Sequence, residues 1–229
     1  MKKSFKIYLN RNIGYLMVSF LSLFYFSCNS TGDETEEFFG SEKSKSNLVL
    51  TPGEYVRWVK KKENGLKKEK TIDDVTFSLQ YKPYPYIVCM EEKKERFPDS
   101  LLNKRISELD GMQYFDLVIS LKSSQGELLK YKIGSSEDYD KRVKYFAFEM
   151  QNDIKLVEKE DTLPCSLFHF ERTYDVAPYC TFLLGFSLDK NKQNNEKTII
   201  LYDRMFDKGT VKFTFNKKEI TNIPKLNNL

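Results

Sequence analysis

The chain has 229 residues, of which 40% are hydrophobic and 14% aromatic, which is enough for the core of one domain and excludes a mainly disordered protein. Its formal net charge of +4 comes from residues 1–27, which hold four basic side chains and no acid. Removing these four leaves 33 basic residues against 33 acidic ones, so the remaining charge gives no reason to expect a nucleic acid partner.

The N-terminus has the three parts of a secretory signal peptide. Residues 1–12 are basic, residues 13–27 are uncharged and apolar, and the small Ser27 precedes Cys28. This order predicts a signal peptide over residues 1–27. The alternative is a retained transmembrane helix, but such a helix needs about 20 apolar residues, and this run is shorter.

The residues around the predicted cleavage site carry a resemblance. Tyr25, Phe26, Ser27 and Cys28 form a segment that resembles a bacterial lipobox, where signal peptidase II cuts before a lipid-modified cysteine. The usual box has Leu three residues before the cysteine and a small residue two before it, and Tyr25 and Phe26 depart from both. Looser boxes of this kind are familiar in Bacteroidota. The resemblance implies a lipid on Cys28 and an outer-membrane anchor. The alternative is an unmodified cysteine near an ordinary signal end.

An acidic tract follows the cysteine within a few residues, at Asp33, Glu34, Glu36 and Glu37. It resembles the acidic export signal that sends some Bacteroidota lipoproteins to the cell surface. The alternative is a plain solvated linker, which leaves a periplasm-facing location open. Either way, we expect residues 28–47 to be a lipidated flexible tether, because they hold too few apolar residues to fold.

The globular domain is expected over residues 48–229, beginning with a helix at about 52–63. Thr51 and Glu54 have the spacing of a capping box, Pro52 suits the first helical turn, and Asn64-Gly65 is a stop signal. The basic residues 60–62 suit the helix C-terminus better than a phosphate-binding patch. A second helix is expected at 99–110 and a short third one near 135–142.

Short segments with β-branched and aromatic residues predict strands through the rest of the domain. The segment 114–123 alternates most clearly, since Phe115, Leu117, Ile119 and Leu121 share one face. The residues 207–210 predict a hairpin turn. The other expected strands are 75–81, 86–90, 128–133, 144–150, 166–172, 181–188, 198–203 and 210–215. The predicted fold class is therefore β-rich α+β, an antiparallel sandwich or open barrel with two or three short helices.

The cysteines and the single histidine give little sign of catalysis or metal binding. One histidine without ligand spacing predicts no metal site, and we expect no cofactor. Cys165 and His169 share a face of one strand but lie roughly 13 Å apart, too far for a nucleophile pair. Cys165 and Cys180 are a candidate disulfide worth about 3 kcal/mol, and three reduced, buried cysteines (including Cys89) are the alternative.

An aromatic, proline-spaced stretch supplies the candidate ligand contacts Tyr81, Tyr84 and Tyr86, together with Trp58. Two prolines place this stretch at an edge strand or loop, where the rings can stack on a sugar or peptide. The alternative is edge packing. The carboxylates Glu149, Glu171 and Asp175 are available to a glycosidase, although the sequence does not pair them.

The sequence contains neither a phosphate-binding loop nor a serine-hydrolase elbow. We therefore expect a lipid-anchored binding or accessory module of the outer membrane, held to the membrane by its N-terminal lipid. Its partner would be an envelope protein or a glycan. The alternative is a surface hydrolase that uses carboxylates on glycans.

Overall fold

The structure is a computed structural model that describes residues 48–122, 126–172 and 177–227. The predictions for Cys28, for residues 28–47 and for Asp175 lie outside these ranges. Within them, every helix is too short or too polar to cross a bilayer.

The described residues form five α-helices and eleven strands. The helices are α1 (Pro52–Lys60), α2 (Tyr84–Glu92), α3 (Asp99–Leu109), α4 (Ser136–Lys144) and α5 (Lys217–Thr221). The strands are β1 (Val49–Leu50), β2 (Lys67–Ile72), β3 (Val75–Lys82), β4 (Met112–Leu121), β5 (Ile154–Glu158), β6 (Asp161–Pro164), β7 (Leu167–Glu171), β8 (Tyr179–Ser187), β9 (Lys197–Asp203), β10 (Gly209–Phe215) and β11 (Lys225–Leu226).

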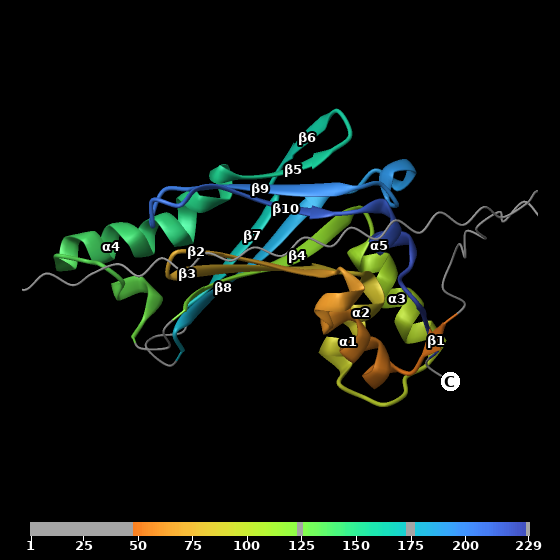
Figure 1. Cartoon of the computed structure of the whole chain (residues 1–229). Coiled ribbons are helices and arrows are strands. Elements are labelled where there is room, and N and C mark those ends of the chain that lie inside the picture. The colour runs from red at the N-terminus through yellow and green to blue at the C-terminus, as the bar shows by residue number, and fades with distance from the viewer. Residues whose placement is uncertain (1–47, 123–125, 173–176, 228–229) are drawn as a thin grey trace, which may run out of the picture. The chain divides into compact units, whose positions relative to one another are not determined.

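Two antiparallel sheets face each other and enclose the core. One sheet has the order β2-β3-β4-β8-β7, and the other has the order β10-β9-β5-β6. Figure 1 shows the second sheet above the first, with α1, α2 and α3 gathered at one end and α4 at the other. Phe115 of β4 and Phe215 of β10 meet between the sheets, with ring centroids 5.7 Å apart. The predicted β-rich α+β sandwich is confirmed, with five helices rather than two or three.

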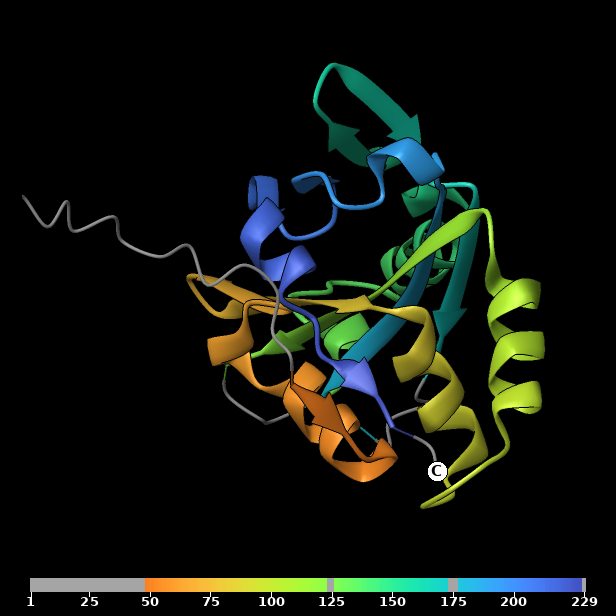
Figure 2. The same cartoon turned by 90° about the vertical axis from the view of Figure 1, so that its right-hand side faces the viewer.

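A small third sheet ties the two ends of the domain together. Strands β1 and β11 pair in parallel, with Val49 opposite Lys225 and Leu50 opposite Leu226. Figure 2 shows them side by side, next to the helices. The first and the last described residues of the domain therefore lie in the same region.

The helices with capping signals form as predicted. The Thr51 hydroxyl donates to Glu54 Oε2 at 2.7 Å, and the Thr51 backbone N–H donates to the same oxygen at 3.0 Å, which starts α1. Gly65, at φ +80°, ends the short 3₁₀ turn that follows α1. Ser135 caps α4 by accepting the N–H of Asp138 at 3.2 Å. Hydrogen bonds between residues close in sequence determine where these helices begin and end, so the local sequence is enough to predict these positions.

Three predicted strands are wrong, because each is helical over all or part of its length. Residues 86–90 lie in α2, residues 128–130 form a 3₁₀ turn, and residues 144–150 end α4 and continue into a π-helix at Tyr145–Glu149. In α2 the consecutive residues from Tyr86 to Cys89 are all buried, so the segment lacks the helical period that would identify it. The π-helix buries Phe146 edge-on against the stacked rings of Phe170 and Phe182, and this packing outweighs the strand preference of aromatic residues.

The proline-spaced stretch is not an edge strand. Strand β3 lies between β2 and β4, and Tyr81 near its end is buried. Pro83 ends the strand and stands at the N-cap of α2, with Pro85 inside the first turn. The two prolines therefore mark the junction between a central strand and a helix.

Candidate functional site

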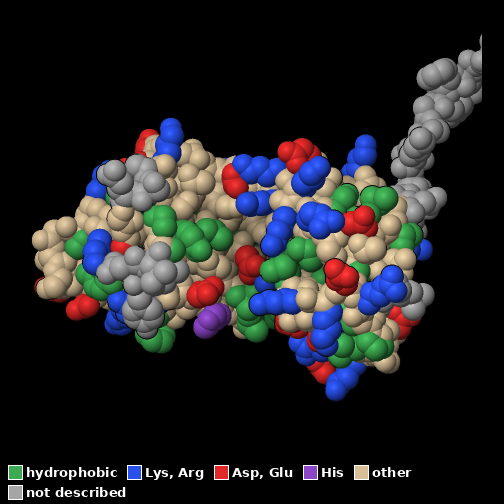
Figure 3. Space-filling model, turned by 90° about the horizontal axis from the view of Figure 1, so that it is seen from below, with side chains coloured by type: hydrophobic (Ala, Val, Ile, Leu, Met, Phe, Trp, Pro, Cys, Tyr) green, Lys and Arg blue, Asp and Glu red, His purple; other side chains and the backbone are tan. Residues whose placement is uncertain are grey.

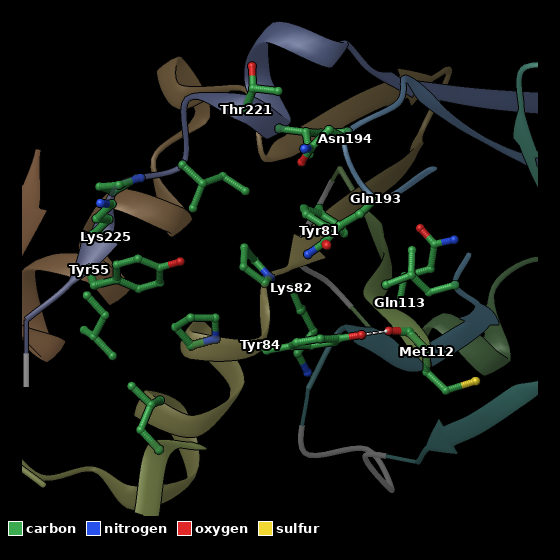
Figure 4. A pocket seen from close by; sticks show the side chains of 18 residues that line it. Tyr55, Tyr81, Lys82, Tyr84, Met112, Gln113, Gln193, Asn194, Thr221 and Lys225 are labelled. Carbon is green, nitrogen blue, oxygen red and sulfur yellow. Dashed lines mark hydrogen bonds between the residues drawn. The ribbon is translucent and has the colours of Figure 1, made fainter. Parts of the chain in front are cut away.

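A pocket of about 580 Å³ opens where α1, the start of α2 and the segment 220–226 meet the ends of β3 and β4. Figure 4 shows the side chains that line it. They come from six separate parts of the chain, including Leu102 of α3 and the loop between β8 and β9 at Gln193 and Asn194. Such a concave, largely apolar hollow with a few convergent polar groups is the usual form of a ligand site.

Three tyrosines form the aromatic part of the lining. Tyr55 comes from α1, Tyr81 from β3 and Tyr84 from α2, and Figure 4 shows Tyr55 and Tyr84 reaching into the pocket from different elements. The Tyr84 hydroxyl donates to the Met112 carbonyl at 2.5 Å, which fixes its ring. Burial raises the pKa of Tyr55 and Tyr81, and it raises the pKa of Tyr84 to about 12. All three hydroxyls are therefore neutral at physiological pH.

Gln113 is the polar group that the protein leaves unsatisfied beside the pocket. Its side chain is 2% exposed, and its Nε2 donates to the Ser187 carbonyl at 3.0 Å. Its Oε1 is buried and accepts no hydrogen bond within the described part of the chain. A buried polar atom without a partner costs free energy, and a ligand N–H or O–H can satisfy Gln113 Oε1 once the amide turns toward the pocket, since this oxygen has almost no exposed surface in the structure.

The pocket carries two cations, and no carboxylate occurs among the described residues that line it. Lys82 is held by an ion pair with Asp116 at 3.0 Å, which compensates its charge. Lys225 belongs to β11 at the pocket rim and is exposed. This lining suits a neutral ligand, or one with a single negative charge near Lys225.

Helix α5 is the wall on the C-terminal side, and Glu219 holds it in place. Glu219 Oε2 accepts the backbone N–H of Asn216 at 2.8 Å, and Glu219 Oε1 pairs with Lys68 at 2.6 Å. The side chain also lies against the backbone of Gly65, where an added Cβ would come within 2.5 Å of it. The wall therefore depends on contacts from β2 and the turn after α1, and Ile220 and Thr221 face the pocket from it.

The four aromatic residues predicted as ligand contacts lie in three different places. Tyr81 and Tyr84 line the pocket, while Tyr86 is buried in α2. Trp58 lines a separate hollow of about 350 Å³ on the other side of α5, with Glu63 and Asn64. The four rings therefore do not form one flat surface.

The candidate disulfide is not formed, because Cys89, Cys165 and Cys180 are free, buried thiols. Ser166 donates its backbone N–H to Gly185, which places Cys165 near the end of β8. Cys180 lies five residues earlier in that strand, about 17 Å away at the spacing of an extended chain. Burial raises the pKa of Cys165 to about 11 and that of Cys180 to about 12.

His169 and the predicted carboxylates lie away from the pocket. His169 is exposed on β7, and Figure 3 shows it in purple at the surface, on a face where basic and acidic side chains are mixed. Glu171 is exposed on the same strand, and Glu149 is exposed at the end of the π-helix. The residues 48–122, 126–172 and 177–227 contain no cluster of three metal-ligating side chains.

The shifted carboxyl pKa values are the reverse of what a glycosidase acid requires. Hydrogen bonds from Thr51 lower the pKa of Glu54, and a hydrogen bond from Lys190 lowers that of Asp110. In Glu69 and Asp74, desolvation raises the pKa, but nearby lysines and hydrogen bonds outweigh it and the net shift is downward. A general acid at neutral pH needs a raised pKa.

Sequence reasoning missed Tyr55, Gln113 and the loop residues Gln193 and Asn194. The spacing of Tyr55, Val56 and Val59 predicts that Tyr55 faces the core, and it is buried, but its position also borders the pocket. No local signal distinguishes these two roles. Comparisons of the sequence with protein-family models and with curated proteins find no match.

Proposed function

We propose that this protein is a lipid-anchored binding module of the outer membrane, exposed at the cell surface, which takes its ligand in the pocket between α1, α2 and α5. The observation that carries the binding role is the lining of this pocket. It combines three neutral tyrosines, a buried unsatisfied amide oxygen and no carboxylate among its described residues. Such a lining can hold a ligand but supplies no acid–base pair for glycoside hydrolysis.

The pocket can be tested by filling it. Thr221 of α5 lines the pocket, so Thr221→Trp should block it. Thr210→Trp is the matched control, because Thr210 is exposed on β10 and does not line the pocket. We would purify each full-length protein in detergent, immobilise it, and identify by mass spectrometry what it retains from the envelope of its own host.

Wild type and Thr210→Trp should retain a component that Thr221→Trp loses. Equal retention by all three proteins would show that the pocket is not the binding site. A glycan that is shortened during the incubation would instead favour the hydrolase.

The anchor has its own test, which rests on the sequence around Cys28. Cys28→Ala should abolish incorporation of labelled fatty acid and leave the precursor uncleaved, because signal peptidase II cuts before a lipid-modified cysteine. Two or three acyl chains contribute about 0.8 kcal/mol per buried CH₂, which is enough to hold a neutral domain on a membrane. Normal processing of the variant, with retention in the membrane fraction, would contradict the anchor.

Variants of the acidic tract test whether the protein faces the cell exterior or the periplasm. Neutralising Asp33, Glu34, Glu36 and Glu37 together should reduce access of external protease to the protein in intact cells. The matched control neutralises four acids of the folded surface, far from the N-terminus, and should leave access unchanged. If external protease reaches the first variant as readily as the wild type, the tract is a solvated linker without an export role, and this result would favour a location on the periplasmic side.

A further inference from the structure

Strand β11 has one edge with which no strand of the described part of the chain pairs. The backbone N–H of Lys225 donates to Leu48 at 2.9 Å, and that of Asn227 donates to Leu50 at 2.8 Å, so both residues point toward β1. Successive residues of a strand direct their backbone groups to opposite edges. The N–H and C=O of Leu226 therefore point away from β1, and within the described ranges no strand pairs with that side.

This edge borders the pocket. Pro224, Lys225 and Leu226 all belong to its lining. Figure 4 shows Lys225 on its strand at one margin of the pocket, with Tyr55 and Tyr84 beyond it. A chain that lay along β11 would therefore run over the opening and place side chains in the hollow.

We propose that the pocket binds an extended peptide segment of an envelope protein, which adds as a strand to the free edge of β11. This inference rests on the proposed binding function and names its ligand class. The peptide backbone accepts from the Leu226 N–H and donates to the Leu226 C=O. The next side chain of the peptide, on the pocket side, enters between Tyr55, Tyr81 and Tyr84. In this mode of binding, the main-chain hydrogen bonds provide affinity and the pocket for the side chain provides specificity.

A peptide matches this edge better than a glycan does. One residue in extended conformation offers a donor and an acceptor at the spacing of a neighbouring strand, which Leu226 requires. The hollow itself is mostly apolar, with Pro83, Pro85 and Pro224 beside the tyrosines. Sugar hydroxyls would leave many hydrogen bonds unmade on such a surface.

The lining also predicts the side chain that the peptide inserts. A buried charge would find no free counter-ion, since Lys82 is already paired with Asp116. The inserted residue should therefore be uncharged and largely apolar. An acidic residue is tolerated only near Lys225, at the rim.

The experiment uses the full-length protein in detergent and random linear peptides displayed on phage. Peptides selected by wild type should also bind Thr210→Trp and should lose binding to Thr221→Trp. One selected peptide is then N-methylated at each position in turn. Methylation of one N–H, the one that donates to the Leu226 C=O, should weaken binding at least tenfold (~1.4 kcal/mol), because Leu226 is the residue of β11 whose backbone groups point away from β1. Peptides methylated at the other positions should bind as before.

Two results would overturn the inference. Selected peptides that bind Thr221→Trp equally well, or that tolerate methylation at every position, would show that strand addition does not occur. If no peptide is selected but a neutral oligosaccharide of the envelope binds wild type and not Thr221→Trp, the ligand class is wrong and the binding function stands. If neither probe distinguishes the two variants, the binding function fails as well.

Discussion

Gly65→Ala is expected to destabilise the domain through two separate effects. The first is backbone strain, because Gly65 has φ +80° and a residue with a Cβ pays about 1–2 kcal/mol in this region. The second is a collision, because the new Cβ would lie 2.5 Å from the Glu219 carboxyl group. Glu219 can rotate away, but it then loses its bonds to Asn216 and Lys68.

The magnitude follows from those contacts. Losing the capping box of α5 costs about 1 kcal/mol. The Lys68–Glu219 ion pair is partly exposed and is worth about 0–1 kcal/mol after solvent screening. With the strain, the free energy of unfolding should fall by roughly 2–4 kcal/mol, and the melting temperature by about 5–15 °C at the usual scaling for a domain of this size.

Gly209→Ala is the matched control. Gly209 also has a positive φ, +68°, but an added Cβ meets no atom of the described residues within 4 Å. It should therefore show the strain alone, about 1–2 kcal/mol. Urea titrations of both variants measure the difference, and adding Glu219→Ala to Gly65→Ala should cost less than the sum of the two single changes. If Gly65→Ala is no less stable than Gly209→Ala, the contact with Glu219 does not support α5.

The remaining predictions concern buried ionisable groups. Lys197 and Glu158 form a fully buried ion pair, so Lys197→Met alone should lower stability by about 3–5 kcal/mol, while Lys197→Met with Glu158→Leu should be near neutral in urea denaturation. Burial raises the pKa of Cys89, Cys165 and Cys180 to about 11, 11 and 12, so the folded state keeps these protons longer than the unfolded chain. The contribution of these thiols to stability should therefore be constant below about pH 8.5, and stability should fall as the pH rises from there toward 11–12; a flat free energy of unfolding between pH 8 and 11 would contradict this. The same thiols should resist alkylation in the native protein and all react in denaturant without reductant, as measured by mass spectrometry, whereas a disulfide would leave two of them unlabelled.

The sequence by itself determined the parts of the fold that local contacts decide. The capping box of Thr51 and Glu54 and the stop at Gly65 define the first helix with its 3₁₀ turn. The alternation from Phe115 to Ile119 defines β4, since one face of that strand is buried and the other is not. In these segments, the residues that determine the structure lie within a few positions of each other.

Strands without an apolar pattern were decided by their neighbours. Strand β2 has the sequence KKEKTI, which carries no strand signal, and it forms because every residue of it pairs with β3. Conversely, residues 86–90 have the composition of a strand and form part of α2, where the consecutive residues 86–89 are all buried. Composition indicates how deeply a segment is buried, but not the backbone conformation that buries it.

The candidate site belongs almost entirely to the tertiary structure. The sequence predicted Tyr81 and Tyr84 as ligand contacts, because prolines and aromatic residues cluster there. It did not show that Tyr55 and Thr221, which lie 166 positions apart in the sequence, would join them around one pocket. Likewise, only the tertiary structure shows that β1 pairs with one edge of β11 and that no strand of the described ranges pairs with the other edge. A pocket forms where residues that are far apart in the sequence leave a space between them. The packing of sheets and helices determines the size and position of this space, and no local sequence pattern does.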